Sequence, residues 1–414
     1  MKVVVVGGGL AGLAAALELS REGHAVTVVE ARPTLGGAVQ TLPEREGDPS
    51  PPPDNGQHVA LGCCTEYVDF LAEIGQSVAL RRMRLGLPVV AEDGRVETIR
   101  PGLLGLLRYG HVSVRERLAI GRVARRLATL DPAAHDHETF GDLLRRLGQS
   151  QVAIDRFWDV FIRPALNLRT DEVSAAPGIF TVQTALLAGG DASDLLLPAA
   201  PLGEMHGVAA AAELGRRGVE ISLDTRIGSL DELEADAVVL AVPSGESARL
   251  LGEDDRRLED SPIVSAHLLF DRPILRFPLA ALLASGAHWL FDRGLLTGHP
   301  PERGQYITIV SSGAPELLEL RGRALVEELA GQVTERLGRA ELLWSRVSRE
   351  PAATFAARPG TASRRPGAVT GRANVVRAGA WTATGWPATM ESAVRSGREA
   401  ARVLSASVRE KVEA

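Results

Sequence analysis

Lysine is almost absent from this 414-residue chain. Among 46 basic residues only Lys2 and Lys411 are lysines, and the others are arginines. Both lysines lie near an end of the chain. We therefore expect no lysine in the body of the fold to take part in chemistry.

Cysteine and long apolar runs are also scarce. The two cysteines, Cys63 and Cys64, are neighbours, which excludes a disulfide framework and the spacing of a metal site, so we expect no metal. No run of 18 uncharged apolar residues is present, and strand-like sequence starts at residue 2. We expect a cytoplasmic protein without a signal peptide or a membrane-spanning helix. The net charge of −6 argues against a nucleic-acid partner.

Glycine, in contrast, is concentrated at the start of the chain. Gly7, Gly9 and Gly12 form G-x-G-x-x-G between a valine run and an Ala/Leu-rich stretch, and a second valine run ends at Glu30. Such glycines permit a tight turn, close approach of a pyrophosphate and close packing of the helix on the sheet. The phosphates then meet free N–H groups at the helix N-terminus, and the acid accepts hydrogen bonds from the ribose. The pattern predicts a dinucleotide site.

A second glycine pair favours FAD as the dinucleotide. Gly36 and Gly37 follow Glu30 by six and seven residues. NAD-dependent dehydrogenases do not need this pair, whereas an extended FAD crosses the loop on its way to the flavin. Glu30 also disfavours the 2′-phosphate of NADP by charge repulsion.

Hydrophobic periodicity predicts an interleaved organisation of two domains. The expected elements are strands at 2–6, 25–30, 219–243, 263–270 and 306–311, helices at 12–22, 65–74 and 315–338, a mainly helical region at 103–170, and an exposed loop at 43–54. Within the helical region, Ser150 is a predicted N-cap, and Pro164 is expected to kink or end its helix. We predict an α/β fold in which a Rossmann-like FAD-binding domain of the glutathione-reductase type is interleaved with a mixed-sheet and helical substrate domain. The FAD-binding domain takes residues 1–85, 208–260 and 371–414, and the substrate domain takes 86–207 (helical) and 261–370 (sheet).

Three stretches carry a resemblance to a known family. They are "DNGQHVALG" (54–62), "FIRPALNLRTDEVSA" with the later "SDLLLPAAPLGE", and "AGAWTATGWPATMESAVRSGREAA" near the end. Together they resemble the hydroxysqualene dehydroxylases, squalene-associated FAD enzymes of the phytoene-desaturase and flavin amine-oxidase superfamily. The resemblance runs over nearly the whole chain. It implies an FAD-dependent oxidoreductase that reductively converts hydroxysqualene to squalene for hopanoid synthesis, with a lipophilic C30 isoprenoid as substrate and an external electron donor that the residues do not identify.

The resemblance also implies a set of FAD contacts. The expected cofactor-binding residues are Gly7, Gly9, Gly12, Glu30, Gly36, Gly37, Asp54, Gly56, His58, Ile227, Gly379, Trp381, Thr389, Met390 and Glu391. Ile227 is expected to meet the adenine through its backbone, and the helix opened by "TMESAVRSG" is expected to face the flavin. Two positions depart from the family: Ala38 replaces an arginine expected at the pyrophosphate, and Ala380 replaces an aspartate expected at the ribityl chain.

Three further side chains are candidates for catalysis. His58 is expected to tune the flavin or donate a proton, with a purely structural turn as the alternative. Arg163 and Asn167 lie four residues apart on a helix expected to wall the substrate cavity, and a helix-capping role for Arg163 is the alternative.

Contact with the inner face of a membrane is expected because the implied substrate dissolves only in bilayers. The segments 100–112 and 274–291 are the candidate docking regions, and either could instead belong to the core.

Three other functions remain open. An amine oxidase that positions a lysine at the flavin is disfavoured, because neither lysine can reach it. An oxidative carotenoid or squalene desaturase would share the fold and the cavity. The replacements at Ala38 and Ala380 also leave open a non-catalytic protein that binds FAD or lipid.

Overall fold

Short valine-rich segments that are far apart in the chain pair in one parallel sheet. The computed structural model describes residues 1–254 and 258–413, with side chains to residue 407. The strand order is β15 (Val375–Arg377), β9 (Ala237–Leu240), β1 (Lys2–Val6), β2 (Ala25–Val29) and β8 (Glu220–Ser222). All four pairings are parallel. The strand order reverses direction at β1, where a ligand crevice is expected beyond the carboxyl ends of the strands.

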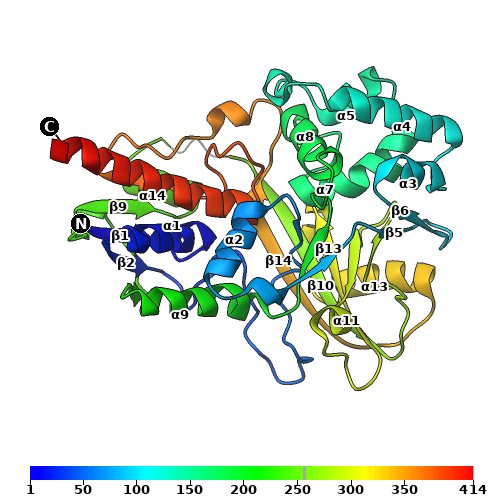
Figure 1. Cartoon of the computed structure of the whole chain (residues 1–414). Coiled ribbons are helices and arrows are strands. Elements are labelled where there is room, and N and C mark those ends of the chain that lie inside the picture. The colour runs from blue at the N-terminus through cyan, green and yellow to red at the C-terminus, as the bar shows by residue number, and fades with distance from the viewer. Residues whose placement is uncertain (255–257, 414) are drawn as a thin grey trace.

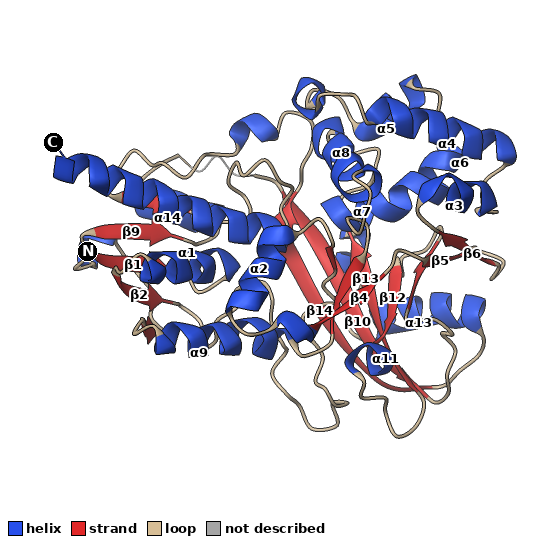
Figure 2. Ribbon diagram, viewed as in Figure 1, coloured by secondary structure: helices blue, strands red, loops and turns tan. Residues whose placement is uncertain are grey.

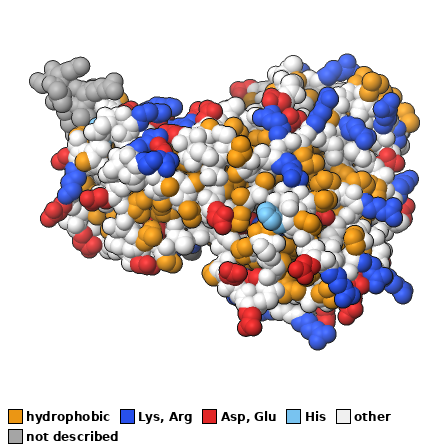
Figure 3. Space-filling model, turned by 60° about the horizontal axis from the view of Figure 1, so that its bottom comes forward, with side chains coloured by type: hydrophobic (Ala, Val, Ile, Leu, Met, Phe, Trp, Pro, Cys, Tyr) orange, Lys and Arg blue, Asp and Glu red, His pale blue; other side chains and the backbone are white. Residues whose placement is uncertain are grey.

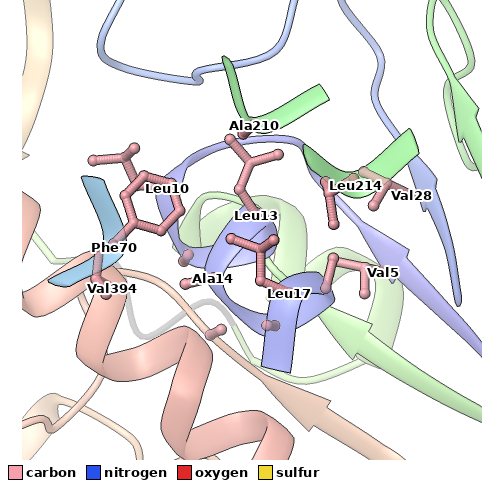
Figure 4. Close-up of a cluster of buried hydrophobic side chains, with 14 of the residues drawn as sticks. Val5, Leu10, Leu13, Ala14, Leu17, Val28, Phe70, Ala210, Leu214 and Val394 are labelled. Carbon is pink, nitrogen blue, oxygen red and sulfur yellow. The ribbon is translucent and has the colours of Figure 1, made fainter. Parts of the chain in front are cut away.

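The first helix, α1 (Leu10–Arg21), is buried on almost every side because Ala and Leu dominate its sequence. Leu13 and Leu17 point toward the sheet strands and α9 (Ala209–Arg216), as Figure 4 shows. The last helix, α14 (Met390–Glu413), lies along α1, and both chain termini lie at the same end of the molecule (Figure 1). The opening turn and the closing helix therefore share one region of the structure.

A second, mixed sheet of seven strands forms the other half of the molecule (Figure 2). Its order is β14 (Leu342–Phe355), β10 (Asp260–Phe270), β13 (Gln305–Ser312), β12 (Trp289–Asp292), β11 (Leu279–Leu282), β5 (Leu87–Val90) and β6 (Val96–Ile99). A smaller sheet pairs β3 (Ala60–Leu61) and β4 (Leu80–Met83) with β7 (Leu195–Pro198).

The two faces of the seven-stranded sheet differ in polarity. Alternate residues of β10, such as Ala266 and Leu268, join the apolar cluster under α13 (Arg323–Leu337). The residues between them, including Ser265 and His267, face the other way because side chains alternate along a strand. His267 lies opposite Thr308 of β13 and Arg346 of β14, and Ser265 lies opposite Ser348 of β14, which gives this part of the sheet a polar face.

Helices cover the apolar part of that second face. Leu87, Leu279 and Trp289 of the sheet pack in one cluster with Tyr109 and Trp158 of the helical region. The helices of this region are α3 (Gly102–Arg108), α4 (Val114–Leu127), α5 (Phe140–Arg146), α6 (Gln151–Ala153), α7 (Asp159–Leu166) and α8 (Ala175–Thr181). The remaining helices are α2 (Thr65–Glu73), α10 (Ser244–Leu251), α11 (Arg293–Thr297) and α12 (Pro315–Glu319).

The predicted α/β class is confirmed, and several local predictions hold. The first two strands of the chain form as expected, and Ser150 caps its helix by accepting a hydrogen bond from the N–H of Ala153. That helix continues through α6, a π-helical stretch and α7 past Pro164, and it ends at Asn167 in a left-handed conformation. The domain boundaries themselves stay a prediction.

Four expectations need correction. The predicted helix at 315–338 is two helices, α12 and α13, separated near Gly322. The helical part at 86–207 also contributes β5, β6 and β7 to sheets. The loop at 43–54 is exposed at residues 43–47, as predicted, but its end turns inward, since Asp54 is buried and Arg346 holds Asp48 in a buried ion pair. The segment 274–291 is core: it contains the buried strand β11 and most of β12.

Gly397 is predicted to be essential for the contact between α14 and α1. A Cβ atom at this position would lie 2.1 Å from the carbonyl oxygen of Ala11. We expect Gly397→Ala to lower the free energy of unfolding by about 1–3 kcal/mol, the usual cost of overpacking a tight contact. Urea denaturation measures the change. The matched variant Gly215→Ala adds a Cβ with nothing within 4 Å in a helix, and should be neutral or slightly stabilising. Equal effects of the two variants would contradict the prediction.

Candidate cofactor-binding and active site

The turn after β1 is packed so tightly that only glycine fits. Gly7 has φ +108°, and a Cβ there would lie 2.2 Å from the carbonyl oxygen of Ala241, just after β9. A Cβ at Gly12 would lie 1.9 Å from the carbonyl oxygen of Gly7. These contacts bring the amino end of α1 to the point where β1 and β9 end, which is the expected crevice.

Backbone atoms of the second glycine pair lie against the amino end of α1. Gly36 donates its N–H to the carbonyl of Gly8 at 2.8 Å, and Gly9 and Gly36 form an isolated β-bridge. A Cβ at Gly37 would lie 2.7 Å from the Cα of Gly9. No side chain caps the helix at Gly9, and its first turn carries no acid. The helix N-terminus is thus bare and positive, which fits a phosphate group.

Glu30 sits beside this turn in a buried position. Its carboxylate accepts hydrogen bonds from the N–H groups of Gly8 at 2.6 Å and Arg32 at 2.9 Å. The N–H of Thr225, beyond β8, donates to the carbonyl of Glu30 at 2.9 Å, which brings the chain before Ile227 to the same edge. The carbonyl of Ile227 itself accepts a hydrogen bond from Arg249 at 3.0 Å.

Arg32 was missed by sequence reasoning, although it lies two residues after Glu30. Its guanidinium is exposed and donates to the carbonyl of Gly37 at 3.2 Å. It therefore supplies a cation at the glycine pair, where Ala38 lacks one. The signal that could have revealed it was its position between the acid and the second glycine pair.

The "DNGQH" loop joins the glycine turns to the second sheet. Asn55 donates to the carbonyl of Ala38 at 2.8 Å. Asp54 accepts from the hydroxyl of Thr41 at 2.7 Å and from the N–H of Leu202 at 2.9 Å. Its other oxygen lies 2.8 Å from the guanidinium of Arg293 on α11, and both side chains are 1% exposed. Both oxygens of the Asp54 carboxylate thus contact other groups of the protein.

Gly56 and His58 lie on the same loop, against the polar face of the sheet. A Cβ at Gly56 would lie 2.8 Å from the hydroxyl of Ser265. His58 is half-buried, its Nδ1 lies 3.2 Å from the carbonyl of Gly56, and burial lowers its pKa. A neutral His58 that donates from Nδ1 keeps an acceptor lone pair on Nε2.

The C-terminal loop reaches the glycine turn from the other side. Trp381 donates its indole N–H to the carbonyl of Val242 at 3.0 Å, and Val242 lies beside Gly7. Gly379 has φ +150° and donates its N–H to Ser396 of α14 at 2.8 Å. Thr389 precedes Met390, the first residue of α14, and its hydroxyl accepts from the N–H of Ser392 at 3.3 Å.

Glu391 has a structural partner in α2. Its carboxylate is fully buried and accepts hydrogen bonds from the N–H groups of Tyr67 at 2.8 Å and Glu66 at 3.3 Å. It also pairs with Arg395 at 2.7 Å. The carboxylate therefore stabilises the amino end of α2, and a contact with FAD stays a prediction.

Arg365 organises the loop that carries the expected flavin contacts. Its guanidinium donates to four carbonyls of this loop: Trp386 at 2.8 Å, Ala380 at 3.1 Å, Trp381 at 3.3 Å, and Thr382. Its carbon Cζ also lies 5.1 Å from the centre of the Phe355 ring. Burial lowers the pKa of Arg365 to about 10. No local pattern around residue 365 predicts this role, because it depends on the folded loop.

Arg163 and Asn167 connect the helical region to the second sheet. Arg163 donates to the carbonyls of Ser312 and Gly313, both at 2.9 Å, and burial lowers its pKa. Asn167 donates to the carbonyl of Ser261 at 3.0 Å and accepts from the N–H of Gly313 at 2.7 Å. Both side chains are buried in these contacts. A catalytic role for either residue stays a prediction.

The bare helix end, the acid beside it and the converging C-terminal loop define an α/β flavoprotein of the oxidoreductase class. A model of the flavin containing amine oxidoreductases matches residues 10–405, so the chain belongs to that family and is an FAD-dependent oxidoreductase.

Several similar curated proteins match nearly the full length of this chain. A hydroxysqualene dehydroxylase from Rhodopseudomonas palustris is 30% identical, over 98% of this chain and 99% of its own. The enzyme of the same name from Sinorhizobium fredii is 29% identical, over 96% and 97%. A zeta-carotene desaturase from a Synechocystis species is 25% identical, over 98% and 97%.

Solved structures show the same fold at low sequence identity. A putative protoporphyrinogen oxidase from an Exiguobacterium species is 17% identical, with TM-score 0.75 over 98% of this chain and 99% of its own. Cyclohexylamine oxidase from Brevibacterium oxydans is 18% identical, with TM-score 0.73 over 99% of each chain.

Arg365 is predicted to be needed for tight FAD binding. The variant Arg365→Met removes the guanidinium group that donates hydrogen bonds to four carbonyls of the 380–386 loop. We expect FAD to bind about tenfold more weakly or worse, since several hydrogen bonds to a charged group are lost. Fluorescence titration of the apoprotein with FAD measures the dissociation constant. The neighbouring Arg364→Met removes an exposed arginine and serves as the control. The prediction is wrong if both variants bind FAD like the parent protein.

Two buried histidines are predicted to make the protein sensitive to acid. Burial lowers the pKa of His206 to about 4 and that of His267 to about 3. Below pH 6.5 these histidines therefore become protonated in the unfolded chain but stay neutral in the folded protein. The free energy of unfolding then falls as the pH falls. For each histidine, the free energy of unfolding should fall by about 2 kcal/mol between pH 7.5 and pH 5.

Urea unfolding of His206→Gln at these two pH values tests the origin of that loss. The variant should lose less stability on acidification than the parent protein, by about 2 kcal/mol. The exposed His137→Gln is the control and should follow the parent. An unchanged pH dependence in His206→Gln would count against the assignment.

Proposed function

We propose that this enzyme removes the hydroxyl group of hydroxysqualene reductively and releases squalene. The observation that carries the proposal is its similarity to three hydroxysqualene dehydroxylases, at 26–30% identity over 96–98% of the chain. Reduced FAD, when bound, would supply the hydride that replaces the hydroxyl group, which takes up a proton and leaves as water. An enzyme acting on a C30 isoprenoid of this kind would serve hopanoid synthesis with an external electron donor.

The proposed FAD contacts use the three groups of residues that converge in the fold. Gly7, Gly9 and Gly12 hold the phosphates together with Gly36 and Gly37, while Glu30 binds the ribose and Ile227 the adenine. Gly56 and His58, with Asp54 behind them, lie on one side of the flavin. Gly379, Trp381, Thr389, Met390 and Glu391 close the site from the C-terminal side. Arg32 and Arg365 add support at the positions where Ala38 and Ala380 lack polar side chains.

The apolar cluster between the helical region and the second sheet suits the isoprenoid chain. It is built from aliphatic and aromatic residues of both layers, such as Phe157, Leu168 and Phe291. A site of this composition excludes water from the reacting carbon. His58 serves best as a hydrogen-bond acceptor, because its lowered pKa keeps it neutral near pH 7. Arg163 and Asn167 keep the helical wall fixed to the sheet.

The position of Lys2, the one lysine whose side chain the structure describes, supports this choice over an amine oxidase. Lys2 stands at the amino end of β1, opposite the glycine turn, and lies 3.9 Å from Glu234. The similarity to zeta-carotene desaturases makes an oxidative desaturase the second candidate. The two functions differ in the direction of electron flow.

An anaerobic experiment separates these functions. The purified flavoprotein is reduced with dithionite, mixed with hydroxysqualene, and followed by flavin absorbance and mass spectrometry. We expect the flavin to reoxidise with formation of one squalene per flavin, and squalene as added ligand to cause no reoxidation. Failure to reoxidise, combined with reduction of the oxidised flavin by a polyene, would identify a desaturase. Purified protein without flavin absorbance would favour a binding protein.

A further inference from the structure

Helices α3 and α4 present apolar side chains to solvent at the end of the molecule far from the termini (Figure 1). Leu103 and Leu104 on α3 are 65% and 71% exposed, and Val114 and Leu118 on α4 are 62% and 53% exposed. We call these four residues the apolar patch. The two helices are held together: Arg117 of α4 donates to the carbonyl of Leu107 at 2.6 Å, and Leu106 packs against Gly121.

The apolar patch lies in the most basic part of the chain. Residues 100–126 contain seven arginines and one acid, Glu116, although the whole chain has a net charge of −6. Glu116 is used in the cap of α4, where it accepts from the N–H of Ser113 at 2.7 Å and the hydroxyl of Ser150 at 2.9 Å. The exposed arginines are Arg100, Arg108, Arg115, Arg122, Arg125 and Arg126. Figure 3 shows basic side chains along the end of the molecule where Figure 1 places α3 and α4.

The opposite faces of the same helices belong to the apolar interior. Ile120, Val123 and Leu127 of α4, with Tyr109 after α3, join the cluster between the helical region and the second sheet. A single layer of helix thus separates the apolar patch from the cluster that we propose to hold the isoprenoid chain. The other segment once considered for docking, 274–291, is buried and is not available.

We propose that α3 and α4 dock on an anionic lipid bilayer, with the apolar patch entering the acyl region and the arginines contacting lipid phosphates. A helix pair with exposed leucines and flanking arginines is the pattern of an interfacial membrane anchor. A nucleic acid would use the arginines but would leave the leucines exposed to water. An acidic protein surface would also leave the leucines exposed to water, unless it offered a matching apolar groove.

This docking deepens the proposed function, because it brings a substrate that dissolves in bilayers to the helices that wall its site. It does not depend on the reaction, since the surface is defined by exposure and charge alone. Membrane binding and dehydroxylation can therefore fail separately in the experiment.

The test is co-sedimentation of the full-length FAD-loaded protein with vesicles, in the absence of substrate. Vesicles of phosphatidylcholine with phosphatidylglycerol should bind the protein, and vesicles of phosphatidylcholine alone should bind it at least about tenfold more weakly. The double variant Leu103→Ser and Leu104→Ser should weaken binding about tenfold or more. The double variant Arg122→Gln and Arg125→Gln should weaken it about fivefold per arginine and reduce its dependence on salt.

The control variant replaces two valines outside the apolar patch that are about as exposed as Leu103 and Leu104. Val208 and Val369 are 65% and 69% exposed and lie on the side of the FAD-binding sheet, so Val208→Ser with Val369→Ser should leave vesicle binding unchanged. Flavin absorbance and circular dichroism confirm that each variant is folded. The proposal is overturned if anionic vesicles do not bind the protein, if the leucine and valine variants bind alike, or if only duplex DNA or an acidic protein binds the arginines.

Measuring turnover in detergent and in vesicles separates a defect in the reaction from a defect in membrane docking. With hydroxysqualene dispersed in detergent, the leucine variant should turn over like the parent, whereas with substrate in anionic vesicles its rate should fall about tenfold with its binding. Vesicle binding without turnover in either form would refute the proposed reaction and leave the docking surface intact.

Discussion

The amino end of α1 is a place where four backbone segments meet without side chains between them. Gly7 touches the chain after β9, Gly12 touches Gly7, Gly37 touches Gly9, and Gly397 of α14 touches Ala11. At each of these glycines an added Cβ atom would lie within 2.7 Å of the neighbouring backbone, which is too close. The arrangement therefore depends on glycine at every one of these positions. It leaves the helix N-terminus without a side-chain cap, where we propose that FAD phosphates bind, and it also sets where the first, middle and last parts of the chain must lie.

Buried charges connect this region to the second half of the molecule. Asp54 and Arg293 join the loop behind the proposed flavin site to α11. Asp48 and Arg346 join the preceding loop to β14, and both pairs are almost fully buried. A buried charge is costly unless its partner is in place, so these pairs tolerate little displacement between the FAD-binding sheet and the polar face of the seven-stranded sheet. The polar face thus holds the loop in place, whereas the helical region covers the neighbouring apolar part of the same face.

Solved relatives that share this fold at 17–18% identity include amine oxidases, and a fold alone does not determine a reaction. What distinguishes this chain lies in particular side chains. The described lysine side chain is at the wrong end of β1 for flavin chemistry, the wall of the proposed cavity is aliphatic and aromatic, and α3 and α4 carry leucines beside arginines. These features agree with the proposed C30 isoprenoid alcohol, delivered from a lipid surface, more readily than with a charged amine delivered from water.

Local sequence was sufficient wherever neighbouring residues alone decide the structure. The valine runs, the glycine spacing and Glu30 determined the βαβ unit and its cofactor class, because the turn and the strand period are set within about 30 residues. Tertiary structure decided the rest. Glu391 caps α2, Arg365 gathers the flavin loop, and Asn167 bonds to Gly313, across separations in sequence that no local pattern records. Segments 100–112 and 274–291 are both rich in leucine, but the packing of the second sheet buries most of the latter and leaves leucines of the former in solvent. Burial depends on what the rest of the chain places against a surface.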